Sequence, residues 1–166
     1  MKLFLTLLVT LSALLPQQIF AAEPLTASLE AHKVVAVTNG KEQLTSAAEA
    51  KPGDVIEYRA TYKNVSKAPL HSVMATLPVP ATGVELMLNS ATPAGVEASI
   101  EGTQFAPVPL KRLVKMPDGT HQQQLVPATE YRFLRWPLGD LPAGASKTVS
   151  ARVRVTNEPT LTTSQK

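Results

Sequence analysis

The three histidines are the first side chains to consider for chemistry, because an imidazole can act as acid, base or metal ligand near neutral pH. His32, His71 and His121 lie in separate segments, and no two have the short spacing of a zinc-binding pair. The chain has no cysteine, which excludes thiol chemistry and cysteine–zinc sites. We therefore predict no metal site and no bound cofactor.

A hydrolase would need a nucleophile on a tight turn, together with a histidine and a carboxylate. The sequence has no Gly-x-Ser-x-Gly motif and no Ser-x-x-Lys motif in a suitable setting. Glu97 and Glu101 come closest to an acid–base pair. They fall on one short predicted strand and its turn, where solvated carboxylates are expected. We predict that the protein is not an enzyme and has no catalytic residues.

The segment around the only tryptophan is the best candidate for recognition of a partner. Strand alternation places Leu134 and Trp136 on the core face, so that Tyr131, Phe133 and Arg135 point the other way. Such a face is too apolar for contact with water alone, and Tyr and Arg are favoured at the centres of interfaces. We predict a partner-binding patch of these three residues. Its rim consists of Lys111, Arg112 and Lys115.

An alternative stays open, in which the insert over residues 110–126 folds over the three residues and buries them. If the patch is free, its partner is expected to be a protein of the cell envelope or surface. Open sheet edges could also accept a strand from a partner or from a second copy, giving a homo-oligomer. Nucleic acid is excluded as a partner, because 16 basic and 13 acidic residues are spread evenly without a clustered basic face.

The N-terminus has the pattern of a secretory signal peptide. Lys2 gives a positive start, residues 3–15 are almost all apolar, and Ala21 and Ala22 form a small-residue exit. The apolar run is shorter than the roughly 20 residues of a membrane-spanning helix. We expect a signal-peptide helix over residues 1–22, cut after Ala21 or Ala22, and no transmembrane anchor after its removal. The protein is then exported, to the periplasm or beyond.

The strand that organises the rest is predicted over residues 55–64, after a Pro-Gly-Asp turn. Ile56, Tyr58, Ala60 and Tyr62 share one face, and polar or charged residues occupy the other, which is typical of a half-buried strand. Further β-prone segments follow this pattern between turn signals. They lie at 29–38, 41–46, 70–77, 84–88, 96–100, 105–110, 130–136 and 147–156, with a hairpin formed by 113–116 and 122–126.

These segments predict an all-β fold, an antiparallel β-sandwich of about seven to nine strands with an inserted hairpin. Fourteen prolines and the lack of a long helical periodicity beyond the N-terminus argue against helices. We expect one domain over residues 23–157 and a disordered tail over 158–166.

Two separated pieces carry a family resemblance. The first runs from Pro52-Gly53-Asp54 through Asn64-Val65-Ser66 to Thr76-Leu77-Pro78, and the second covers residues 134–144. Together they resemble the conserved-repeat domain of bacterial surface and exported proteins, domain of unknown function eleven. The resemblance spans about residues 45–157 and implies an immunoglobulin-like β-sandwich, with Trp136 between the sheets. Family members often carry an aspartate where this chain has Ala75, so that ligand of a cation site is missing here.

From these observations we expect an exported, non-catalytic, immunoglobulin-like module. Its role would be structural, adhesive or protein-binding, at the bacterial cell envelope. Family copies often occur in tandem, whereas one copy without a wall anchor favours a small exported protein. The alternative is a carbohydrate-binding or enzyme-accessory module of the envelope. That class needs an exposed platform of coplanar aromatic rings, and most of the eight aromatic residues are needed for the core.

Overall fold

The computed structural model describes residues 23–36 and 40–157. The predicted signal peptide, residues 37–38 of the strand predicted over 29–38 and the predicted tail lie outside these residues. Over the described part the chain is all-β, and every strand pairing is antiparallel. The described helical elements are two 3₁₀ turns, η1 (Leu88–Ser90) and η2 (Ala128–Glu130). The predicted all-β class is confirmed.

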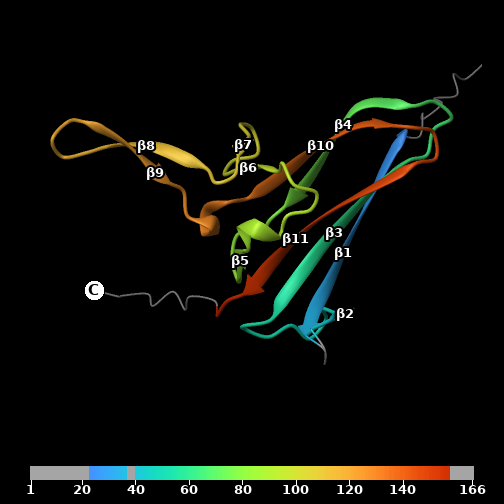
Figure 1. Ribbon diagram of the computed structural model, residues 1–166, viewed down its shortest axis with the longest axis horizontal. Helices are drawn as coiled ribbons and strands as arrows, with labels where there is room; N and C mark the ends of the chain where they lie inside the picture. The colour runs from blue at the N-terminus through green and yellow to red at the C-terminus, as the bar shows by residue number, and fades with distance from the viewer. Residues whose placement is uncertain (1–22, 37–39, 158–166) are drawn as a thin grey trace, which may run out of the picture.

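The larger sheet has five strands in the order β2-β1-β3-β11-β5. Its centre is β3, which pairs with the first and the last described strands of the chain. Figure 1 shows these long strands running side by side. Their bounds are β1 Leu25–Ala36, β2 Glu42–Ser46, β3 Val55–Asn64, β5 Val84–Leu86 and β11 Ser146–Val155.

A four-stranded sheet, in the order β4-β10-β6-β7, forms the second layer. A separate hairpin, β8 with β9, projects away from both sheets (Figure 1). The bounds of these strands are β4 Leu70–Pro78, β6 Glu97–Ser99, β7 Ala106–Pro107, β8 Lys111–Lys115, β9 His121–Leu125 and β10 Phe133–Leu141.

The two larger sheets share one hydrophobic core. Trp136 of β10 is 1% exposed, and its Nε1 donates a hydrogen bond to the carbonyl of Pro93 at 2.8 Å. The Tyr62 hydroxyl donates to the carbonyl of Thr76 and accepts from its N–H, which links β3 to the outer edge of β4. Both sheets contribute further buried residues: Ile56, Ala60, Val149, Val153, Ala75, Leu77 and Leu134.

Asn64 closes one end of the core. Its side chain is fully buried, and its Nδ2 lies 2.8 to 3.2 Å from the carbonyls of Ala68, Leu141 and Pro142. Its Oδ1 accepts from the N–H and the hydroxyl of Ser66. The Asn64-Val65-Ser66 segment is therefore a turn that joins the end of β3 to the end of β10.

The organising strand has the predicted bounds, and the predicted hairpin of β8 and β9 forms around its Pro-Asp-Gly-Thr turn. The strand predicted over residues 130–136 begins and ends later than expected, because β10 runs from Phe133 to Leu141. β6 pairs only with residues 133–135 of β10, so no partner there requires the N–H that Pro137 lacks. The register shifts around Gly139 absorb the irregularity.

Glu57 lies on the predicted outer face of β3, yet it is only 6% exposed. Arg59 donates to its carboxylate at 2.6 Å and Arg152 of β11 donates at 3.0 Å. Burial by itself raises the pKa of Glu57, but the two guanidinium groups outweigh burial, and its pKa lies below the usual value. Arg152 also donates hydrogen bonds to both carboxylate oxygens of Glu42. These hydrogen bonds lower the pKa of Glu42.

Candidate interaction surface

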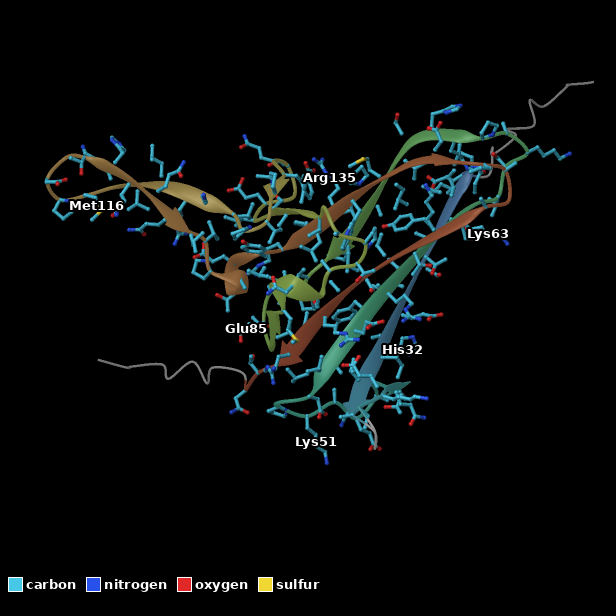
Figure 2. The ribbon with its side chains drawn as sticks, in the orientation of Figure 1. His32, Lys51, Lys63, Glu85, Met116 and Arg135 are labelled. Atoms are coloured by element: carbon cyan, nitrogen blue, oxygen red, sulfur yellow. The ribbon has the colours of Figure 1, made fainter. Side chains whose placement is uncertain are left out.

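We call the hairpin of β8 and β9 the arm. Its strands pair from Lys111 opposite Leu125 to Lys115 opposite His121. The Asp118 carboxylate closes the tip, because it accepts from the N–H and the hydroxyl of Thr120 at 2.9 and 2.7 Å. Those bonds lower the pKa of Asp118. Figure 2 shows Met116 at the tip, far from Arg135 on β10.

One face of the arm combines leucine and lysine. In an antiparallel pair, residues directly opposite each other share a face, as do residues two positions apart on one strand. Leu113 and Leu125 therefore lie diagonally on the same face, and they are 65% and 63% exposed. The other members of this leucine–lysine face are Lys111, Lys115, His121 and Gln123. All six are exposed.

The base of the arm is fixed to the core. Leu110 and Val126 are buried, and the Val126 N–H donates to the Leu110 carbonyl at 2.9 Å. The Leu110 N–H donates to the Tyr131 hydroxyl at 2.6 Å. Arg112 and Glu130 form an ion pair at 2.7 Å. The arm thus projects from a well-anchored base.

Tyr131 is fully buried, so its assignment to the centre of the predicted patch is wrong. The prediction that Tyr131 points outward relies on the alternation of side chains along a strand, and this alternation applies only within a strand. β10 begins at Phe133, and Tyr131 follows the 3₁₀ turn η2 instead. The open alternative is right that this residue is buried, and Leu110 at the base of the insert bonds its hydroxyl, but the hairpin beyond Leu110 projects away instead of folding over it (Figure 1).

Phe133 and Arg135 do point away from the core, but the segment over residues 97–105 lies against them. Arg135 donates to Glu97 at 2.7 and 3.1 Å, and its guanidinium lies 3.9 Å from the centre of the Phe105 ring. The Phe133 ring packs on Gly102, where a side-chain carbon would lie only 2.8 Å from it. Both residues are half-buried. This segment therefore covers Phe133 and Arg135, whereas the rim residues Lys111, Arg112 and Lys115 stay exposed on the arm.

A shallow concavity of about 350 Å³ lies at the foot of the arm, beside the segment that covers Phe133. Ile100, Leu110 and Val126 give it an apolar lining, and Ile100 is 39% exposed. Lys111 and Arg112 also line it. The arm is therefore accompanied by a hollow at its base whose lining is partly apolar and partly polar or charged.

No described group of three or more histidine, cysteine, aspartate or glutamate side chains is placed to hold a metal ion. His32 contacts Glu30 at 3.1 Å, His71 contacts Asp140 at 3.1 Å, and His121 lies on the arm. The contact from His71 is the main cause of a lowered pKa at Asp140. A second concavity, of about 640 Å³, lies beside β11 and is lined by Glu57, Arg152 and other mostly polar residues.

Comparison with known proteins finds no matching protein family, no matching curated protein and no matching solved structure. Within residues 23–36 and 40–157, no helix is long and apolar enough to cross a bilayer. The fold and the surface together define a class: an antiparallel all-β protein from which one anchored, apolar and basic hairpin projects.

Proposed function

We propose that the protein is a non-catalytic interaction module that binds another protein through its arm. The observation that carries this proposal is the exposure of Leu113 and Leu125 on one face of the arm, more than 60% each. Burying a leucine in an interface is worth about 1.5–3 kcal/mol. Two exposed leucines on an anchored hairpin therefore favour association.

The basic residues of the arm indicate the chemistry of the partner. Arg112 is paired with Glu130, whereas Lys111 and Lys115 flank the leucines on the same face. Asp118 at the tip is the one acidic residue between positions 111 and 125. A partner with an apolar groove and an acidic rim would complement this face in both shape and charge.

Export to the cell envelope is part of the proposal and is supported by the signal-peptide pattern of the N-terminus. An immunoglobulin-like sandwich related to domain of unknown function eleven is its structural part. Two antiparallel sheets that share a core around Trp136 support it. The carbohydrate-binding alternative is less favoured, because all six described aromatic residues are buried or half-buried, and no exposed ring platform is formed among them.

The test uses a photoreactive amino acid at position 113, in the intact source cell, followed by mass spectrometry. The matched control carries the same group at Val65, which is 50% exposed but lies away from the arm. We expect a defined protein to be captured from position 113 and not from position 65. Capture of the same proteins from both positions would contradict the proposal.

Binding of the captured partner should then depend on both chemical features of the arm. Replacing both leucines by serine should weaken the affinity about tenfold or more, since 1.4 kcal/mol corresponds to a factor of ten. Val65→Ser should leave the affinity unchanged. Replacing Lys111 and Lys115 by glutamate should slow association with the partner and reverse the dependence of the association rate on salt.

A further inference from the structure

The edge of β1 has a free half. β2 pairs with β1 only between His32 and Ala36, whereas β3 pairs with it from Leu25 to Val34. Residues 25–31 therefore have a strand on one side only, among the residues that the structure describes. Figure 1 shows β2 at one end of β1 and no described strand beside the rest of it.

The hydrogen-bonding groups of this free half can be placed from its register. The Val65 N–H donates to the Pro24 carbonyl at 2.9 Å, just beyond the first pair of the ladder. Hydrogen-bonded and non-hydrogen-bonded pairs alternate along an antiparallel ladder. Residues 26, 28 and 30 therefore bond to β3. The N–H and C=O groups of residues 25, 27, 29 and 31 point to the free side.

Apart from the charge of Glu30, this edge lacks the features that keep exposed strands from pairing with other chains. Such edges usually carry lysine, proline, a bulge or a covering group. Residues 25–31 have no lysine and no proline, and their register with β3 is continuous. The open edge of β4, in contrast, is covered at Thr76 by the Tyr62 hydroxyl and ends in Pro78.

The same half of β1 also presents apolar surface. Leu29 lies opposite Ala60, and so on the core side of the five-stranded sheet, yet it is 52% exposed. Ala27 and Ala31 share this face and are exposed as well. No described strand of the second sheet covers them. An added strand would satisfy the free backbone groups and cover part of this surface.

We propose that the free edge of β1 pairs antiparallel with the same edge of a second copy, around a two-fold axis at Ser28. Ser28 is the midpoint of the free half, so this register uses all seven residues and stops where β2 begins. Leu29 of each copy then faces Ala27 of the other, and Glu30 faces Thr26. Large residues meet small ones and no like charges are opposed. The pairing is isologous, as a two-fold dimer requires.

A single introduced cysteine tests the register, because the chain has none of its own. Ser28 would face its own copy in a non-hydrogen-bonded pair, where the Cα atoms lie about 4.5 Å apart, within disulfide reach. Ser28→Cys in the exported, processed protein should form a disulfide dimer rapidly under mild oxidation. Thr26→Cys is the matched control. It lies on the same edge but faces Glu30, four residues from its own copy.

Sedimentation of the protein without cysteine provides the second measurement. We expect a concentration-dependent shift to twice the monomer mass. Leu29→Lys should abolish the shift without changing the circular-dichroism spectrum, and Leu113→Ser, on the arm, should leave it unchanged. A monomer at every concentration, or equal cross-linking at positions 26 and 28, would overturn the dimer. Neither result bears on the partner proposed for the arm.

Discussion

The hydroxyl of Tyr131 shows how one buried polar atom determines the position of a larger feature. It accepts a hydrogen bond from the Leu110 N–H at 2.6 Å. The carbonyl of Leu110 in turn accepts a hydrogen bond from the Val126 N–H. The base of the arm is thereby tied to the turn before β10. A tyrosine that the sequence suggests for recognition therefore acts as a structural anchor.

We predict that Tyr131→Phe lowers stability by about 1–3 kcal/mol, because the buried Leu110 N–H loses its partner. Thermal unfolding would measure this change. Tyr58→Phe is the control, since Tyr58 is half-buried and its hydroxyl forms no hydrogen bond among the described residues. Equal melting temperatures for Tyr131→Phe and the parent protein would contradict the anchoring role.

At the scale of elements, the arm contributes little to the core. Its strands are exposed throughout except for Val114, which is half-buried. Leu110 and Val126 are already joined by a backbone hydrogen bond at its base. The arm is therefore a feature that the fold carries rather than one on which the fold depends.

Replacing residues 111–125 by a two-residue turn should leave cooperative unfolding intact and shift the melting temperature by only a few degrees. The same deletion should abolish capture of a partner. Differential scanning calorimetry would measure the first effect. If the shortened chain does not unfold cooperatively, the arm belongs to the core and the proposed function loses its structural basis.

Elements with local signals could be predicted from the sequence. Alternation alone gives the bounds of β3, and two β-prone segments around a Pro-Asp-Gly-Thr turn give the arm. The burial of Glu57 and Tyr131 could not be predicted this way. Their partners Arg152 and Leu110 are 95 and 21 residues away in the chain. The cover of Arg135 likewise comes from Glu97 and Phe105, through contacts that no local pattern encodes.

At the scale of the whole molecule, the carboxylates make stability depend on pH in one direction. The pKa values of Glu42, Asp54, Glu57, Asp118 and Asp140 all lie below their usual values, mainly because of bonds that favour the ionised form. Each such group stabilises the fold fully above its unfolded-state pKa. That contribution is lost as the pH falls through the lower, folded-state pKa.

We therefore predict that the free energy of unfolding is constant near neutral pH and falls on acidification below about pH 4.5. Urea unfolding between pH 7 and pH 2 would measure it. Glu57→Gln should lower stability at pH 7 and flatten the acid decline, because its charged contribution is already absent. A variant with an unchanged acid slope would show that Glu57 does not contribute to the decline.

The position of β11 has a consequence for how the chain matures. This strand covers Ser146–Val155, far along the chain from β3, yet it fills an interior place between β3 and β5. A polypeptide synthesised only as far as the arm lacks β10 and β11, so β3 then has β1 as its single paired neighbour. Completion of the larger sheet must therefore wait until β11 has also been released. Until then the apolar faces of the earlier strands remain accessible to chaperones.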